Sequence, residues 1–230
     1  MTLSEAIEQL VLANRIISHE GILDAFGHVS ARHPHDPGKF LLSRSLAPSL
    51  VRREDILVFD LESRPVQDYD CSLYAERVIH GEIYKARPDV NGVCHHHAPS
   101  VLTFAISHRK LEPVSQMGAV IGHHVPLWDS QDEFGDTNLL LVKPEEGRSL
   151  AKALDQNWLV LMRRHGATCV GRSIQEMTFR TIYSAANADL LLRAMMVGRV
   201  ETLTPGEIDR AGEIKPLAVE RAWDYWTDRL

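Results

Sequence analysis

A run of three histidines is the feature of this sequence with the clearest chemical meaning. His95, His96 and His97 follow the apolar residues Val93 and Cys94, which predicts that they end a buried strand. Alternation along a strand points His95 and His97 to one face and His96 to the other. Two imidazoles so placed can bind one metal ion, and nitrogen ligands suit zinc, iron, cobalt, nickel or manganese. The alternative is a strand whose histidines are satisfied by hydrogen bonds alone.

Two further residues would complete a ligand set. His165 follows another predicted buried strand, residues 157–162, at its C-terminal end, where open α/β sheets bind their ligands. Glu76 lies in a predicted helix, 19 residues before His95. Three imidazoles and one carboxylate are enough for a catalytic metal site that keeps open positions for substrate.

The elements that must position these residues alternate between strands and helices. Thr2 and Glu5 form a predicted capping box for the first helix, and Ser173 with Glu176 another for a long helix that ends near Gly198. Strands are expected at residues 26–33, 39–43, 58–61, 90–97 and 157–162, and further helices at 72–86, 99–107 and 218–230. The pattern predicts a layered α/β domain, and because no linker interrupts it we treat residues 1–230 as a single domain.

Composition narrows the class of protein. The 230 residues are 44% hydrophobic and 24% charged, which is typical of a globular chain. A net charge of −6 without a long basic run argues against nucleic acid as a partner. The sequence contains no apolar run long enough for a membrane span and no signal peptide pattern. Three widely spaced cysteines predict a reducing, cytoplasmic environment.

Taken in order, these motifs resemble the class II aldolase/adducin family. The match runs from about residue 4 to residue 198, and its pieces are Gly-His-Val-Ser at 27–30, Glu76, Arg-Pro-Asp-Val-Asn-Gly-Val at 87–93, His-x-His at His95 and His97, and His165-Gly166. The resemblance implies a three-layer αβα domain around a mainly antiparallel or mixed sheet. It also implies one divalent ion per chain, Zn²⁺ or Mn²⁺, bound by His95, His97 and His165. Glu76 would be an acid/base residue that can also approach the metal, and the chain would form a homotetramer with active sites at subunit interfaces.

Departures from the family pattern indicate a changed substrate. Members that act on sugar phosphates cradle the phosphate with small Gly, Ser and Thr turns, whereas this chain has Leu-Ser-Arg-Ser at 42–45 and Ser-Leu-Tyr-Ala at 72–75. The side chains in these turns are bulky and one is an arginine, so glycine backbone amides are no longer offered to a phosphate. An arginine suits a planar carboxylate. His28 also stands where the family usually has asparagine. The pattern resembles the decarboxylase branch, whose members act on hydroxylated aromatic or pyridine dicarboxylates.

Our leading hypothesis is therefore a metal-dependent lyase that decarboxylates a small anionic substrate of this kind. The ion would chelate the substrate hydroxyl and the adjacent carboxylate and stabilise the charge that develops as CO2 leaves. Glu76 is the first candidate for the proton donor and His28 the second. Arg44 would hold a remote carboxylate, and Ser45 and Tyr74 are further candidate substrate contacts. The plain alternatives are a surface ion pair for Arg44 and core packing for His28 and Tyr74.

Two other functions remain open at the level of sequence. The first is an aldolase that cleaves a sugar phosphate or hydroxy-ketone through a metal-stabilised enediolate, which is the parent activity of the family. The second is a non-catalytic, adducin-like binding module, against which the intact set of Glu76, His95, His97 and His165 argues.

Overall fold

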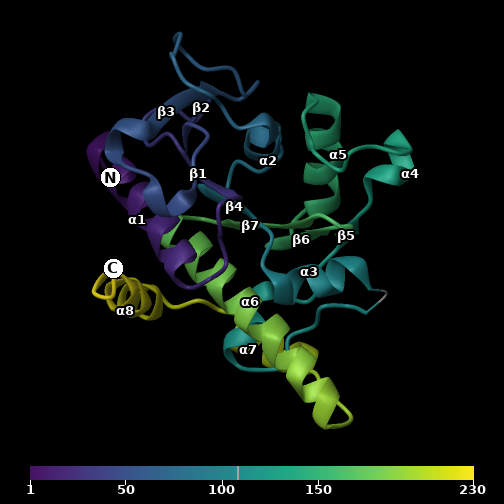
Figure 1. Cartoon of the computed structure of the whole chain (residues 1–230). Helices are drawn as coiled ribbons and strands as arrows, with labels where there is room; N and C mark the ends of the chain where they lie inside the picture. The colour runs from purple at the N-terminus through teal and green to yellow at the C-terminus, as the bar shows by residue number, and fades with distance from the viewer. Residues whose placement is uncertain (108) are drawn as a thin grey trace.

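A mixed sheet of seven strands is the centre of the fold, which we describe from a computed structural model covering residues 1–107 and 109–230 (Figure 1). The strand order is β3-β2-β1-β4-β7-β6-β5, and all neighbours are antiparallel except the parallel pair β5 and β6. The strands are β1 (His28–Arg32), β2 (Lys39–Ser43), β3 (Ile56–Asp60), β4 (Gly92–His96), β5 (Leu127–Trp128), β6 (Leu159–Met162) and β7 (Gly166–Gly171).

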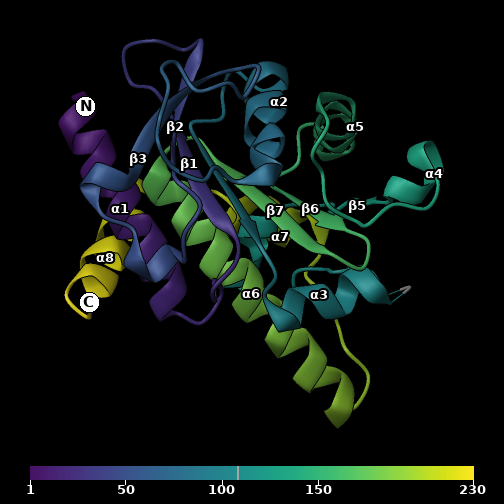
Figure 2. The same ribbon diagram turned by 45° about the horizontal axis from the view of Figure 1, so that its top comes forward.

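Helices cover both faces of this sheet. They are α1 (Leu3–His19), α2 (Val78–Ala86), α3 (Pro99–Ile106), α4 (Ser130–Phe134), α5 (Pro144–Leu154), α6 (Ile174–Val197), α7 (Pro205–Ala211) and α8 (Pro216–Thr227). Short 3₁₀ turns occupy Pro48–Leu50, Arg53–Asp55, Ala75–Arg77 and Met117–Ile121. Helices α2 and α5 lie on one face, and α1, α3, α6 and α8 lie on the other (Figures 1 and 2). Each face has its own apolar core, so the expected three-layer αβα class is confirmed.

Burial on both faces explains why the central strands carry almost no exposed residues. Every residue of β1, β4, β6 and β7 is buried. Helix α6 packs beneath these strands with its first five turns, whereas none of its residues after Leu191 is buried, and this end projects from the body in Figure 1. Of the helices that the structure describes, none combines the length and the apolar character that a membrane span needs.

Several elements begin where the sequence predicts. The Thr2 hydroxyl accepts from the Glu5 amide at 3.2 Å, and the Glu5 carboxylate accepts from the Thr2 amide at 2.7 Å, which confirms the capping box of α1. Strand β2 has the predicted bounds. The capping box predicted for α6 is only half formed: the Ser173 hydroxyl accepts from the Glu176 amide at 3.0 Å, but the Glu176 carboxylate pairs with Arg180 one turn later.

Other predictions were wrong in their bounds or missed an element. The helix expected from residue 72 begins only with the 3₁₀ turn at 75–77, and Glu76 has non-helical angles of φ −85° and ψ 16°. The strands expected at 58–61 and 90–97 are at 56–60 and 92–96. The structure also contains β7, α5 and α7 in stretches where no regular element was predicted.

Strand β4 sets the register for the residues of interest. It pairs with β1 so that His28 lies opposite His95, and with β7 so that His96 lies opposite Ala167. Because β4 and β7 are antiparallel, the end of β4 lies beside the start of β7 and therefore beside the turn that carries His165. Antiparallel pairing therefore brings these segments to the same end of the strands. The sequence pattern predicts instead that they meet at the carboxyl ends of neighbouring strands, as in open α/β sheets.

Gly27 is the residue that lets β1 approach the end of β4 closely. Its φ of +88° lies in the left-handed region, and a Cβ added there would lie 2.8 Å from the carbonyl oxygen of His95 and would overlap Leu23. Gly21 has a similar φ of +73°, but a Cβ there would meet nothing within 4 Å. A substitution at Gly21 therefore measures the energetic cost of the unusual backbone angle alone, whereas a substitution at Gly27 adds the energetic cost of a forced contact.

We predict that Gly21→Ala lowers the free energy of unfolding by about 1–2 kcal/mol, the usual cost of a left-handed φ for a residue with a Cβ. Gly27→Ala should cost about 1–3 kcal/mol more, because overpacking adds to the backbone term. Urea unfolding followed by circular dichroism measures both values. Equal destabilisation by the two substitutions would contradict the close approach of residue 27 to His95.

Candidate metal centre

Three imidazoles converge at the C-terminal end of the central strand β4. The ring centroids of His95 and His97 are 4.7 Å apart, and the ring of His165 lies 4.9 Å from the first and 5.2 Å from the second. One ring nitrogen of each lies within 4.8 Å of the others. The prediction that His95 and His97 share a face is confirmed, since their Nε2 atoms are 3.0 Å apart.

The turn between β6 and β7 presents His165. Arg164 takes a left-handed φ of 58°, and its amide donates to the carbonyl of Ala105 at 3.1 Å. Gly166 then passes so close to β4 that a Cβ there would lie 2.9 Å from the His97 ring and would overlap the His96 carbonyl. A side chain at position 166 would therefore push His165 away from the other two imidazoles.

The hydrogen bonds of His95 determine which of its nitrogens is free. Its Nδ1 lies 3.1 Å from the carbonyl oxygen of Ala167. A carbonyl can only accept, so Nδ1 carries the proton and donates, which leaves a lone pair on Nε2. Burial, together with the neighbouring imidazoles, lowers the pKa of His95 well below its usual value and keeps the ring neutral. A backbone carbonyl behind a histidine is the arrangement that orients metal ligands.

His165 provides a second sign that the cluster suits a ligand. Its Nδ1 atom is buried and meets no hydrogen-bond partner among the residues that the structure describes. Burial, followed by the effect of His97, lowers the pKa of His165 to about 4, so this ring is also neutral near pH 7. Neutral imidazoles with unused ring nitrogens are the form in which histidine binds divalent metals, so the residues present fit such an ion.

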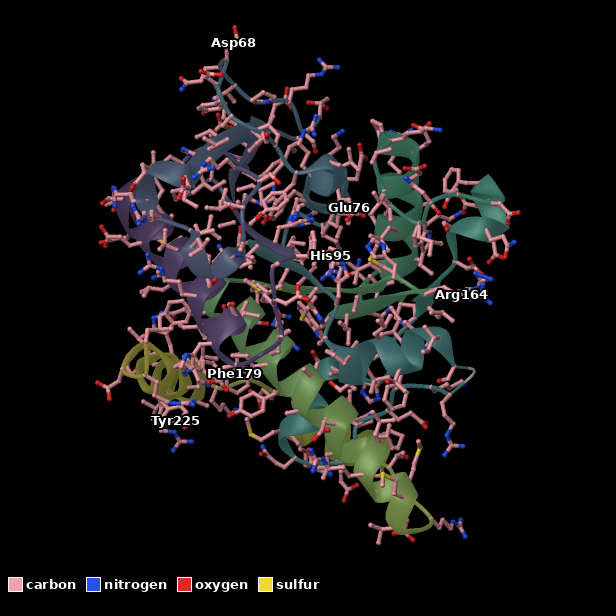
Figure 3. The ribbon with its side chains drawn as sticks, in the orientation of Figure 1. Asp68, Glu76, His95, Arg164, Phe179 and Tyr225 are labelled. Carbon is pink, nitrogen blue, oxygen red and sulfur yellow. The ribbon has the colours of Figure 1, made fainter. Side chains whose placement is uncertain are left out.

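Glu76 lies next to the cluster, and Figure 3 shows it near His95. Its Oε2 atom lies 3.7 Å from His165 Nε2 and 3.9 Å from His95 Nε2, and its Oε1 accepts from the Leu141 amide at 3.0 Å. Burial raises the pKa of this carboxyl to about 7. Because Glu76 lies in the 3₁₀ turn before α2, its side chain faces the histidines at the start of the helix.

His28 lies at the same end of the sheet but on a neighbouring strand. Its ring centroid is 5.1 Å from that of His95 and 4.7 Å from that of Tyr74. His28, Glu76 and His95 form a second group whose possible ligand atoms lie within 4.8 Å of one another. Two overlapping ligand sets are thus possible from distances alone.

A cavity of about 390 Å³ opens next to these residues, large enough for a small ring compound. Six of the predicted site residues line it, namely His28, Ser45, Tyr74, Glu76, His97 and His165. The Tyr74 hydroxyl donates to the Leu46 carbonyl at 2.5 Å, which leaves the ring of this residue as the part that faces His28.

Arg44 does not line this cavity. Its Nε donates to the buried carboxylate of Asp55 at 2.6 Å, and both residues line a neighbouring cavity that shares only Leu46 with the first. The ion pair that the sequence allowed as the alternative is therefore present. A role for Arg44 in binding substrate stays a prediction, and it would need the guanidinium to reach past Leu46.

Sequence reasoning missed the apolar wall and the partner of Glu76. Phe26 and Leu140 line the cavity, and the amide of Leu141 binds the Glu76 carboxylate. Leu141 lies 65 residues beyond Glu76 in the sequence, and Leu140 is its neighbour. Both belong to an irregular segment without a motif. Only the fold brings these residues to the site.

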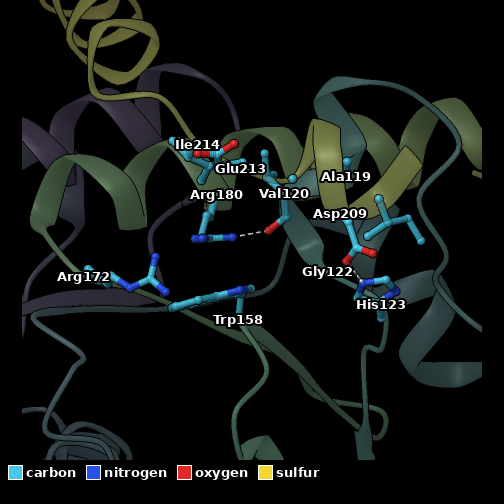
Figure 4. A pocket seen from close by; sticks show the side chains of 12 residues that line it. Ala119, Val120, Gly122, His123, Trp158, Arg172, Arg180, Asp209, Glu213 and Ile214 are labelled. Carbon is cyan, nitrogen blue, oxygen red and sulfur yellow. Dashed lines mark hydrogen bonds and ion pairs between the residues drawn. The ribbon is translucent and has the colours of Figure 1, made fainter. Parts of the chain in front are cut away.

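Another cavity, of about 320 Å³, lies between α6, α7 and the turn before β5, and Figure 4 shows its lining. Its charged groups are already paired. His123 binds Asp209 at 2.7 Å, and the buried guanidinium of Arg180 donates to the Val120 carbonyl and stacks 3.9 Å above the Trp158 ring. These contacts connect α6 and α7 to the body of the domain and leave no free reactive group, so we place the candidate active site at the histidine cluster.

Known proteins are similar to this chain over most of its length. A family model described as Class II Aldolase and Adducin N-terminal domain matches residues 8–192. The chain is 32% identical over 235 residues to Decarboxylase tropJ of Talaromyces stipitatus, which spans 92% of this chain and 88% of that protein. It is 25% identical to 3,4-dihydroxyphthalate decarboxylase of Arthrobacter keyseri, over 86% of this chain and 82% of that protein.

Solved structures agree with the fold. L-fuculose 1-phosphate aldolase from Glaciozyma antarctica PI12 superposes with a TM-score of 0.82 at 22% identity, over 98% of this chain and 88% of that chain. Likeness at this level of identity concerns the architecture alone.

We predict that the purified chain binds one divalent ion and that His95→Ala or His97→Ala removes this binding. Affinity should fall by more than the roughly 10- to 100-fold that loss of an outer-shell partner of a metal ligand costs. Calorimetric titration with Zn²⁺ and elemental analysis measure the change. His35→Ala, which removes an exposed histidine, is the control and should bind Zn²⁺ as the wild type does. Undiminished Zn²⁺ binding by both site variants would rule out this ligand set.

Proposed function

Because this chain belongs to the class II aldolase and adducin family, we propose that it is a metal-dependent lyase that decarboxylates a hydroxylated aromatic or pyridine carboxylate or dicarboxylate. Family membership and relatives named decarboxylases support a carbon–carbon lyase. The finer steps, namely the metal, its identity as Zn²⁺ or Mn²⁺ and the substrate class, rest on the histidine cluster and on the chemistry of the cavity.

One observation favours an acid over a sugar phosphate as substrate. The turn at 43–45 occupies the place where sugar-phosphate members are expected to offer backbone amides to a phosphate. Here the amide of Arg44 donates to the Asp55 carbonyl and that of Ser45 to the Ser72 carbonyl, both at 2.8 Å. These donors are therefore spent inside the protein. The neighbouring walls, Phe26, Tyr74 and Leu140, offer flat and apolar surfaces that suit a ring.

The residues of the site can be assigned roles in this reaction. His95, His97 and His165 would hold the metal ion, with Glu76 close enough to join them. A divalent ion bound there supplies a Lewis acid for the negative charge that develops on the substrate as CO2 leaves. The ring carbon that loses CO2 keeps the bonding electron pair and must take a proton.

Glu76 is the proposed source of that proton. Burial raises the pKa of its carboxyl, which favours the protonated form that a general acid must hold, and its Oε2 atom lies within 3.9 Å of two imidazole nitrogens of the cluster. After donation the carboxylate still accepts from the Leu141 amide, so its position does not depend on the proton. His28, which has a ring nitrogen within 4.8 Å of a Glu76 carboxylate oxygen, is the second candidate, and its hydrogen bonds decide what it can donate.

The assembly is a further part of the proposal. We infer a homotetramer with active sites at subunit interfaces, as the family resemblance implies. In the single chain, the side chain of Phe26 at the cavity is 70% exposed and Leu140 is 41% exposed. Apolar side chains around a site are the kind that a neighbouring subunit covers. Three free cysteines support a cytoplasmic location.

We predict that the chain loaded with Zn²⁺ or Mn²⁺ releases CO2 from ortho-hydroxy aromatic or pyridine dicarboxylates. Glu76→Gln should lower kcat by about 10²- to 10⁴-fold, the usual share of a general acid, because the amide accepts from Leu141 but has no acidic proton. A screen of such acids beside sugar phosphates, with CO2 and aldehyde measured together, tests the proposal. Release of an aldehyde from a sugar phosphate without any CO2 would establish the aldolase alternative, and metal-free inert protein would favour the binding module.

We predict that variants of Arg44 and of its ion-pair partner Asp55 distinguish substrate binding from a purely structural role of Arg44. If the guanidinium also binds a remote carboxylate, Arg44→Ala should raise KM for a dicarboxylate by about 10- to 150-fold, the value of a charge-assisted contact, and Arg44→Lys should restore little. Asp55→Asn removes the other half of the ion pair and should leave KM near the wild-type value. If both Arg44→Ala and Asp55→Asn change only the unfolding temperature, Arg44 serves the ion pair alone.

A further inference from the structure

A chain of buried hydrogen bonds leads from the candidate site into the core. His28 Nδ1 lies 2.6 Å from His80 Nε2, His80 Nδ1 lies 2.6 Å from Ser30 Oγ, and Ser30 Oγ lies 2.8 Å from the Tyr84 hydroxyl. His80 and Ser30 have no exposed surface, Tyr84 is 1% exposed and His28 is 3% exposed. Only the His28 end reaches the cavity.

Local structure explains why these four residues meet. His28 and Ser30 are two positions apart on β1 and so point to the same face of the sheet. His80 and Tyr84 are four positions apart on α2 and so lie on the same side of that helix. Helix α2 packs on this face, which places one pair against the other.

The protons on the four hydrogen-bonded side chains can be counted. His28 and His80 are both buried, and burial lowers the pKa of His80 to about 3, so each ring is neutral and carries a single proton. The two hydroxyls carry one proton each. Four protons are therefore available for three hydrogen bonds, and they can all donate toward the cavity or all donate toward Tyr84.

The Tyr84 end decides between these two directions. If Tyr84 accepted from Ser30, its own hydroxyl proton would be buried without an acceptor, since Ser30 is its partner among the described residues. The guanidinium carbon of Arg32 lies 4.7 Å from the centre of the Tyr84 ring, and this positive charge makes the phenol a better donor and a poorer acceptor. Tyr84 thus donates to Ser30, Ser30 to His80 Nδ1, and His80 Nε2–H to His28 Nδ1.

We propose that Tyr84, Ser30 and His80 hold His28 as the Nε2–H tautomer, so that His28 offers a hydrogen-bond donor to an anionic oxygen of the substrate. The same bonds withdraw His28 from the second possible ligand set, because a protonated Nε2 has no lone pair for a metal ion. His95 has the opposite tautomer, with its proton on Nδ1 toward Ala167 and its lone pair on Nε2. His80, Ser30 and Tyr84 are positioning residues, and only the identity of the oxygen as part of a carboxylate or phenol rests on the proposed function.

Nitrogen NMR tests the tautomer without any substrate. In protein labelled with ¹⁵N-histidine, long-range ¹H–¹⁵N spectra distinguish Nδ1–H from Nε2–H rings, and the spectra of His28→Asn, His80→Gln and His95→Ala assign the three signals. We expect Nε2–H for His28 and His80 and Nδ1–H for His95, with the His28 tautomer unchanged when Zn²⁺ is added. A proton on His28 Nδ1, or coordination of Zn²⁺ by His28 Nε2, would overturn the proposal.

A matched pair of variants tests the role of the buried hydrogen bonds in turnover. His80→Gln keeps an N–H donor near the position of Nε2, whereas His80→Met fills similar space without one. On the substrate found by the screen, His80→Met should lower kcat/KM by about 10- to 150-fold, the range of a hydrogen bond to a charged group, and His80→Gln should stay within about threefold of the wild type. Zn²⁺ affinity should not fall in either variant, because both keep the ligands His95, His97 and His165.

The outcomes separate this inference from the proposed function. Equal kcat/KM for His80→Gln and His80→Met would refute a positioning role. If His80→Met fails to fold, the wild-type spectrum still decides the tautomer. A chain that releases no CO2 from any acid would end the proposed function, while the NMR result for His28 would stand or fall by itself.

Discussion

The pairing register of β4 with its two neighbours is the constraint on which the rest of the site depends. It sets His28 opposite His95 and His96 opposite Ala167, and it brings the turn that carries His165 beside His97. In a strand a slip of one residue moves every side chain to the other face. Such a slip would send His95 and His97 toward the opposite core and would leave His96 alone at the cavity. The glycines at 27 and 166 permit this register, because any side chain there would collide with the backbone of β4.

Desolvation then sets the chemistry of the side chains that the register collects. Each of His28, His80, His95 and His165 has a lowered pKa because burial disfavours the charged ring, so the cluster presents neutral imidazoles. Burial acts in the opposite direction on Glu76 and raises its pKa to about 7. Lone pairs for a metal and a proton for the substrate therefore arise from one physical cause. What remains is the choice of tautomer, and here the partners differ: His95 faces a backbone carbonyl, whereas His28 faces the Nε2–H group of the neutral His80 ring.

The sequence predicted the parts of this structure that local signals control. The cap of α1, the bounds of β2 and the shared face of His95 and His97 follow from side-chain types and spacing. Strand β7 was missed because it is six residues long and has glycine at both ends, and α5 because few of its residues are apolar. Glu76 was placed in a helix that starts later, since Arg77 is held by the carbonyls of Ser63 and Tyr74. The Asp55 partner of Arg44 is likewise a tertiary contact that no pattern near residue 44 indicates.

Substrate recognition in this fold can use backbone amides or side chains, and the two have different requirements. An amide donates in a fixed direction and needs no support, but the amides of Arg44 and Ser45 are consumed by the carbonyls of Asp55 and Ser72. A histidine in a neighbouring position can replace such a donor only if its tautomer is held, because a neutral imidazole that is free to exchange its proton accepts as readily as it donates. His80 and Tyr84 supply that control from α2, the same helix that the Glu76 turn precedes. On the proposed function, the start of one helix would therefore position the proton donor, and its interior would orient the group that binds the substrate oxygen. Helix α2 would then connect binding and protonation, so that a shift of this helix would disturb both.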